Sequence, residues 1–170
     1  LEQYDGWTGD IIFSKQKKFA ASIGKFLISF SNLEHSLDIE LADLINERGH
    51  DVGYIIIKNL GMFEKIELYY NLVFPKVHFS EKRRKQKLKQ LSSIRKQLEG
   101  ATILRNKIAH AKWNTLDKDN YVRVDAKTSK ENGLIKFRKF KISPLVMKKG
   151  ITEMEKLADE LASFAERIWP

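Results

Sequence analysis

The stretch LRNKIAHAKW, residues 104–113, holds the residue types in this chain that could carry out chemistry. Asn106 and His110 are four residues apart, so a helix would place them on one face. Arg105 would point about 100° away from Asn106 on a regular helix, so a loosened last turn is needed to bring all three side chains together. The sequence therefore predicts a cluster at the point where a helix ends.

This cluster has the parts needed to cut RNA without a metal. An imidazole transfers protons near neutral pH, and a guanidinium binds a phosphate through two oxygens. In such a reaction the ribose 2′-hydroxyl is the nucleophile, His110 is the general base or acid, and Arg105 stabilises the charge that develops on phosphorus. Asn106 can orient either partner. An ordinary helix end fits the same spacing, with His110 as a favourable cation at the C-terminus and Arg105 paired with an acidic neighbour.

The elements that must position the cluster are mainly helical. Apolar residues at steps of three and four predict a first helix from Lys15 to about Arg48, with Gly49 as its stop. The same periodicity predicts a second helix over 54–73, ended by Pro75, and a third from near Ser80 to His110. The first helix shows the clearest stripe: Phe19, Ile23, Phe26, Phe30, Leu33, Leu37, Leu41 and Leu44.

A change of pattern follows Trp113. The stretches YVRVDA and LIKFRKFKI are β-branched and aromatic, and the polar stretch between them contains an Asn-Gly pair, which predicts a β-hairpin. Ser143 and Pro144 then fit the N-cap and first residue of a last helix, although Gly150 leaves its start open. The fold expected is a single domain over 1–170: a four-helix bundle with an N-terminal extension (1–14) and a hairpin insertion (113–142) before the last helix.

Composition favours an anionic partner. The 170 residues carry 31 Lys and Arg against 22 Asp and Glu, a formal charge of +9, which attracts RNA before any specific contact forms. A solvated basic surface would explain the charge equally well. The residues expected to contact RNA are Lys107, Lys112, Trp113, Arg83 and Arg84, the last two from the run EKRRKQKLK. Trp113 could stack on a base or anchor the hairpin, and the anchor is favoured.

Several other classes of protein are disfavoured. The chain has no cysteine, and His35, His50 and His78 have no partners at ligand spacing, so we expect no metal and no cofactor. No apolar run approaches the roughly 20 residues that span a bilayer, so we expect no membrane partner. These features favour a cytoplasmic protein.

The segment RNKIAHA resembles the signature of HEPN domains, compact helical bundles whose motif is Arg, four to six residues, then His, often with a polar residue after the Arg. Here the gap is four residues. The stretch FSNLEHSLDIELADLI, residues 30–45, is similar to the first helix of many such domains, where a Leu-Glu pair follows an aromatic residue. Together with the closing helix, the resemblance spans the chain from about Lys15 to Ile168.

This resemblance implies a metal-independent endoribonuclease that leaves 2′,3′-cyclic phosphate ends, commonly a toxin or antiviral defence effector. It also implies a homodimer in which both copies of the motif line one active site, and a possible antitoxin or regulatory partner. By position, His110 transfers protons, Arg105 binds phosphate, Asn106 orients, and Glu34 is a supporting residue or an ordinary boundary carboxylate. The hairpin departs from the minimal bundle. The alternative is a non-catalytic module that binds RNA or a nucleotide, or a dimeric interaction protein.

Overall fold

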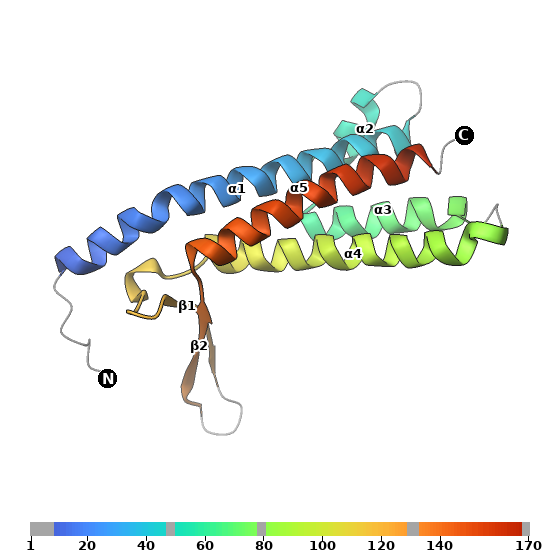
Figure 1. Cartoon of the computed structure of the whole chain (residues 1–170). Helices are drawn as coiled ribbons and strands as arrows, with labels where there is room; N and C mark the ends of the chain where they lie inside the picture. Colours follow the sequence, from blue (N-terminus) through green and yellow to red (C-terminus); the bar gives the residue numbers. More distant parts are fainter. Residues whose placement is uncertain (1–8, 47–49, 78–80, 129–132, 168–170) are drawn as a thin grey trace. The chain divides into compact units, whose positions relative to one another are not determined.

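The computed structural model describes residues 9–46, 50–77, 81–128 and 133–167. Within them the chain is mainly helical and carries one small antiparallel hairpin, as the sequence predicted (Figure 1). No helix in these ranges is long and apolar enough to cross a membrane. The helices are α1 (Gly9–Ile45), α2 (His50–Ile57), α3 (Met62–Lys76), α4 (Glu81–Ala109) and α5 (Pro144–Glu166), with a short 3-10 helix η2 (Trp113–Thr115) and strands β1 (Tyr121–Thr128) and β2 (Ile135–Lys141).

Contacts between residues group the chain into two compact units. The first contains Leu1–Leu27 and Leu104–Ile151, and the second contains Ile28–Ile103 and Thr152–Pro170. The helices α1, α4 and α5 each contribute residues to both units. The first unit thus holds the hairpin with the end of α4, and the second holds α2, α3 and most of the helical residues. A single domain over 1–170 stays a prediction.

The core of the first unit forms where the hairpin meets helical segments. Its buried apolar residues come from α1, α4, α5 and the segments around the hairpin: Phe19, Phe26, Ile108, Leu116, Val122, Ile142 and Met147. A β-carbon at Gly150 would lie 2.8 Å from Cε2 of Phe26 and 3.2 Å from Cδ2 of Leu104. Glycine is therefore needed where α5 approaches these two side chains.

The start of α5 follows the predicted cap. The Ser143 hydroxyl accepts a hydrogen bond from the Val146 N–H at 3.2 Å, and Pro144 is the first helical residue. This bond satisfies one of the donors that a helix N-terminus leaves unpaired. The predicted N-cap is confirmed, and the helix continues through Gly150.

The hairpin pairs β1 with β2 in antiparallel register, with Tyr121 opposite Lys141 and Thr128 opposite Ile135. An irregularity lies between Arg123 and Asp125. Gly133 has a positive φ of 68°, a conformation that glycine adopts without a steric cost. The predicted turn residue Asn132 lies outside the described residues.

The second unit has a larger apolar core. Its members include the part of the predicted stripe of the first helix that follows Leu27, with Leu33, Leu37 and Leu41 buried. The remaining buried apolar residues come from all five helices and from Val77, the residue after α3: Phe30, Ala42, Ile57, Met62, Ile66, Tyr69, Val73, Val77, Leu91, Ile94, Leu98, Met154, Leu157, Leu161 and Phe164.

One predicted helix is wrong in its extent. The sequence predicted a single helix over 54–73, but α2 ends at Ile57 and α3 begins at Met62. Gly61 has extended backbone and its N–H donates to the Glu64 carboxylate at 2.6 Å, so it starts a new helix. Pro75 was predicted to end the helix, but it lies inside the last turn of α3, which continues to Lys76. A proline in the last turn removes one backbone hydrogen bond, and the turn still forms.

The first helix also differs from its prediction. It begins at Gly9, so residues 9–14 are helical rather than part of the expected extension, because an established helix gains one bond for each residue it adds. It ends at Ile45, short of the expected end. Residues 1–8, Arg48 and Gly49 lie outside the described residues, as does the predicted cap Ser80.

Candidate functional site

The end of α4 loosens at the predicted point. Ala109 is the last helical residue, and the His110 N–H still donates to the Asn106 carbonyl at 3.0 Å. The next N–H, of Ala111, donates to the Ile108 carbonyl at 3.4 Å. This bond spans three residues instead of four, which is typical of a tightened last turn. Ile108 is fully buried and fixes the inner face of this turn.

Arg105 and Asn106 are joined by their side chains. The Arg105 Nη1 donates a hydrogen bond to Asn106 Oδ1 at 3.0 Å, and both residues are half-buried. A guanidinium has five N–H donors, and this bond fixes the direction of one of them. The two side chains are therefore held together, and an orienting role for Asn106 stays a prediction.

His110 is exposed at the first position after α4. Its imidazole makes no hydrogen bond or ion pair with the residues that the structure describes, and only its backbone bonds to Asn106. The structure therefore brings Arg105 and Asn106 into contact and shows no contact from the His110 ring to either. The ring is accessible to a substrate from solvent.

Trp113 anchors the segment that follows the helix. Its Nε1 donates to the Ile108 carbonyl at 3.2 Å, and its ring lies 5.8 Å from that of Phe19 in a tilted arrangement. The same segment is tied to the hairpin, because the backbone N–H of Lys112 donates to the Arg123 carbonyl at 2.8 Å. These contacts are the ones expected if Trp113 anchors the hairpin, which is the alternative that the sequence favoured. The Lys112 side chain is exposed.

The hairpin adds a feature that the sequence analysis missed. The Lys107 ammonium lies 4.7 Å from the centre of the Phe140 ring, and the Arg123 guanidinium lies 3.9 Å from that of Phe137. Phe137 is 44% exposed. Cations on aromatic faces next to exposed rings are typical of surfaces that bind single-stranded nucleic acid. The alternation of cations and rings in KFRKFK was the signal available in the sequence.

We compared the chain with protein-family models, curated proteins and solved structures. None of them matches it. The function must therefore be argued from the residues and their geometry.

Glu34 belongs to an ion-pair cluster in the second unit. Its Oε1 lies 3.0 Å from Nζ of Lys65, and Asp38 Oδ1 lies 2.8 Å from the same nitrogen. Burial lowers the pKa of Lys65, but hydrogen bonds to Asp38 and Glu34 outweigh it, so the pKa is raised. These contacts are consistent with the second interpretation of Glu34, an ordinary carboxylate at the boundary of the core. Sequence analysis missed Lys65, although it lies beside Ile66 in the helical stripe.

A second titratable group lies nearby along α1. Burial raises the pKa of the Glu40 carboxyl to about 7, and repulsion from Asp43 and Glu166 adds to this shift. Burial and the charge of Glu40 also raise the pKa of Tyr69, whose buried hydroxyl has no hydrogen-bond partner among the described residues. Of these two groups, only the Glu40 carboxyl has a pKa near neutral pH.

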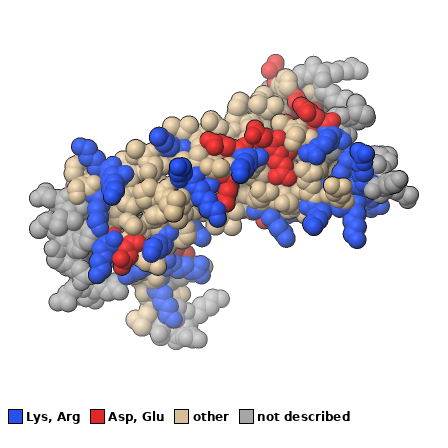
Figure 2. Space-filling view, viewed as in Figure 1, with Lys and Arg blue, Asp and Glu red and all other residues tan. Residues whose placement is uncertain are grey.

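The basic residues at the start of α4 lie in the second unit. Arg83 is exposed and Arg84 is half-buried. On the face seen in Figure 2, Lys and Arg are spread over the surface rather than gathered in one patch. The net charge alone therefore does not locate an interface.

The two described histidines outside the motif, His35 and His50, do not belong to a metal-binding cluster of described residues. His35 is exposed, and Nδ1 of His50 lies 2.7 Å from Oδ1 of Asp43. His78 lies outside the described residues. In the part of the chain that is described, no three His, Asp or Glu side chains lie close enough to hold a metal ion.

Proposed function

We propose that the chain is a metal-independent endoribonuclease of the HEPN type, with a four-helix bundle as its frame. The observation that carries the proposal is the 3.0 Å hydrogen bond between Arg105 and Asn106, one turn before the exposed His110. This arrangement supplies an oriented guanidinium for a phosphate and an accessible imidazole for proton transfer. The charge of +9 favours RNA as the substrate.

The proposed reaction is an internal transfer at phosphorus. The His110 imidazole takes the proton of a ribose 2′-hydroxyl, whose oxygen attacks the adjacent phosphorus while the bond to the 5′-oxygen breaks. Arg105 stabilises the charge on the phosphorane, and the departing 5′-oxygen takes up a proton. The products are a 2′,3′-cyclic phosphate and a 5′-hydroxyl end. Because one imidazole takes a proton while a second group must give one, two copies of the motif in a homodimer suit this chemistry.

The proposed context is a cytoplasmic toxin or antiviral effector whose activity is restrained by an antitoxin or regulatory partner. An endoribonuclease that is active in its own cell would damage cellular RNA, which is why a restraining partner belongs to the proposal. The proposed RNA contacts in the first unit are Lys107, within the motif, and Lys112 and Trp113, just after it; Arg83 and Arg84 are those in the second unit. Glu34 is retained as a support for α1 through Lys65.

The test is RNA cleavage by the purified protein in excess chelator. We expect cleavage to leave 2′,3′-cyclic phosphate ends, and we expect Arg105→Ala and His110→Ala to reduce the rate by about 10²- to 10⁴-fold. His35→Ala is the matched control, because His35 is also exposed but lies outside the motif. A substrate with 2′-deoxyribose at the cleaved position should resist the enzyme. Cleavage that persists in both motif variants would show a contaminating nuclease and overturn the proposal.

The second candidate is a module that binds RNA or a nucleotide without cutting it, or a dimeric interaction protein. The observation that favours binding is the pairing of Lys107 with Phe140 and of Arg123 with Phe137 on the hairpin. Such a module would retain a single-stranded RNA without producing cyclic phosphate ends. Light scattering tests the homodimer in either case, and a monomer at assay concentration would remove the shared active site.

A further inference from the structure

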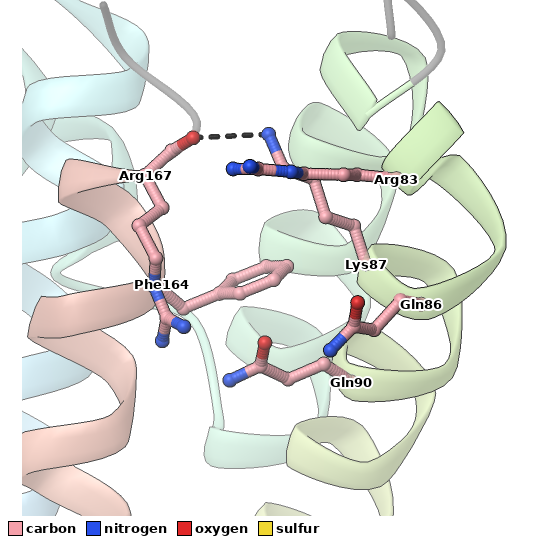
Figure 3. A pocket seen from close by; sticks show the side chains of 6 residues that line it. All are labelled: Arg83, Gln86, Lys87, Gln90, Phe164 and Arg167. Carbon is pink, nitrogen blue, oxygen red and sulfur yellow. Dashed lines mark hydrogen bonds between the residues drawn. The ribbon is translucent and has the colours of Figure 1, made fainter. Parts of the chain in front are cut away.

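The excess positive charge of the chain belongs to its first unit. Of the 31 Lys and Arg and the 22 Asp and Glu in the sequence, 17 and 7 fall in the first unit, which leaves 14 and 15 for the second. The second unit has surface cations too, and three of them, Arg83, Lys87 and Arg167, line a pocket of about 420 Å³ with Phe164 (Figure 3). Carboxylates elsewhere in that unit balance its cations in number. An anionic partner is therefore attracted mainly to the first unit.

Strand β2 concentrates this charge. Its seven residues include four exposed cations and no carboxylate; the cations are Lys136, Arg138, Lys139 and Lys141. Two of its apolar side chains are also exposed, Ile135 by 62% and Phe137 by 44%. On the paired strand, Asp125 stands opposite Arg138. The strand thus presents both apolar and cationic side chains to solvent.

The outer edge of β2 has no neighbour among the described residues. The sheet has two strands, so β1 occupies one edge of β2 and leaves the other open. The outer edge of β1 differs, because the Arg123 carbonyl accepts a hydrogen bond from the Lys112 N–H at 2.8 Å, and the Arg123 N–H donates to the Thr115 hydroxyl at 2.9 Å. An open edge is a row of backbone donors and acceptors with which another strand can pair.

The pairing of the two strands shows which backbone groups of β2 point to this open edge. The Ile142 N–H donates to the Asn120 carbonyl at 2.8 Å, so the backbone of Ile142 points toward the β1 side. The irregularity in register lies on β1, and the backbone direction alternates along β2 without a break. The outward N–H and C=O groups are therefore those of Ile135, Phe137, Lys139 and Lys141, whose side chains also share one face.

The side chains of β2 favour one kind of strand over others. A second copy of β2 would place four cations beside four cations, which is unfavourable. RNA could contact the cations, but it has no alternating N–H and C=O groups to pair with the edge, and the aliphatic Ile135 offers no ring on which a base can stack. An extended acidic peptide matches both features, since its backbone pairs with the edge and its carboxylates pair with the cations.

We propose that the outer edge of β2 binds an acidic peptide segment of a partner protein, which adds a third strand to the hairpin. In antiparallel register this segment carries carboxylates opposite the four cations and apolar side chains opposite Ile135 and Phe137. Backbone hydrogen bonds supply affinity, and the side chains select an acidic segment over a basic one. The site is separate from the motif at the end of α4 and does not depend on cleavage.

The test uses a fluorescent heptapeptide, Glu-Val-Glu-Glu-Val-Glu-Val, with blocked ends and the full chain, and measures binding by anisotropy. In antiparallel register the peptide places a glutamate opposite each cation of β2 and a valine opposite each apolar residue. N-methylation of its third and fifth residues, whose N–H groups face β2, should weaken binding at least about 10-fold. N-methylation of the fourth and sixth residues, whose N–H groups point away, should change it less than about twofold. The two modified peptides have equal charge, so they separate strand pairing from charge attraction.

A pair of protein variants locates the site. Lys139→Glu should weaken peptide binding about 10-fold or more, because it places a carboxylate opposite a glutamate. Lys25→Glu is the matched control, since Lys25 is an exposed cation of α1 in the same unit and the change in net charge is identical. Backbone amide exchange at Phe137 and Lys139 should slow when the peptide binds, since their N–H groups point to the open edge.

Three results would overturn the proposal. The first is no binding of the heptapeptide at millimolar concentration. The second is equal weakening by the two N-methylated peptides or by the two protein variants, which would show charge attraction without strand pairing. The third is a single-stranded uridine heptanucleotide that binds more tightly than the peptide and is equally sensitive to Lys139→Glu, which would assign β2 to nucleic acid instead.

Discussion

Lys65 of α3 is bound to Glu34 of α1 through a contact of 3.0 Å between Nζ and Oε1. The side chain of Lys65 is only 7% exposed, whereas that of Glu34 is 33% exposed. The buried member of the pair is therefore the cation, and Asp38 completes its neutralisation. The glutamate of the Leu33-Glu34 pair in the first helix thus has a structural use that requires no RNA.

Replacing Lys65 should destabilise the second unit. Lys65→Ala leaves Glu34 and Asp38 without their cation, and because these carboxylates are 33% and 20% exposed, the cost should stay below the roughly 3–5 kcal/mol of a fully buried pair. Urea unfolding followed by circular dichroism measures this loss. Lys58→Ala is the control, because Lys58 is exposed. A loss below about 1 kcal/mol would show that the cluster is solvated rather than buried.

Glu40 should make the stability depend on pH. Its pKa is about 7 in the folded protein and 4.5 in the unfolded chain, so the folded state binds more protons between these values. Stability should therefore fall as the pH rises from 4.5 to about 7 and stay low above it. Glu40→Gln should remove this fall and stabilise the protein near pH 8 by up to about 3 kcal/mol, less where solvent screens the carboxylate.

The measurement is the free energy of unfolding at several pH values for both proteins. Glu155→Gln is the control, since Glu155 is an exposed carboxylate on α5. Parallel pH curves for the original protein and Glu40→Gln would show that Glu40 does not carry the effect.

Two glycines should respond in opposite directions to alanine. A β-carbon at Gly53 of α2 would lie 2.5 Å from Cα of Ala42 on α1, so Gly53→Ala should force the helices apart and cost about 1–3 kcal/mol or more. A β-carbon at Gly100 meets no described atom within 4 Å, so Gly100→Ala should stabilise α4 by about 0.4–1 kcal/mol. Thermal unfolding of both variants checks the pair, and the same sign for both would contradict the close approach.

Asn106 should act by positioning Arg105. Asn106→Ala removes the acceptor at 3.0 Å and should lower the cleavage rate by about tenfold, less than the loss of Arg105 itself. Asn106→Asp keeps an acceptor and should retain orientation. Rates at saturating RNA, with KM measured separately, distinguish a misplaced guanidinium from weaker binding. An Asn106→Asp variant as slow as Asn106→Ala would show that the amide has another role.

Local patterns in the sequence were enough for much of the fold. The stripe of α1, the Ser143 cap and the paired strands follow from spacing and residue type within a few positions. The division between α2 and α3 was missed because Ile57, Leu60 and Ile66 continue a helical period across the turn at Gly61. A helical period in the sequence shows which residues face the core. The same period can continue across a turn that separates two helices.

The candidate sites could be predicted only where their residues are close together in the sequence. Arg105, Asn106 and His110 lie within one short segment, and their order could be recognised from spacing. Lys65 and Arg83 depend on residues that are distant in sequence: Lys65 on Glu34 in another helix, and Arg83 on Phe164 and Arg167 across a pocket. Spacing along the sequence cannot predict these neighbours, because they come together only when α3 packs against α1 and α5 packs against α4.

The Lys107 and Phe140 contact also provides a built-in spectroscopic reporter. Protons on the Lys107 side chain lie over an aromatic ring, with Nζ 4.7 Å from its centre, so the ring current should shift their resonances. Adding RNA that lifts β2 from the end of α4 would return those resonances toward their random-coil positions. A single isotope-labelled lysine would thus report, in solution and without cleavage, whether the hairpin moves when a strand arrives.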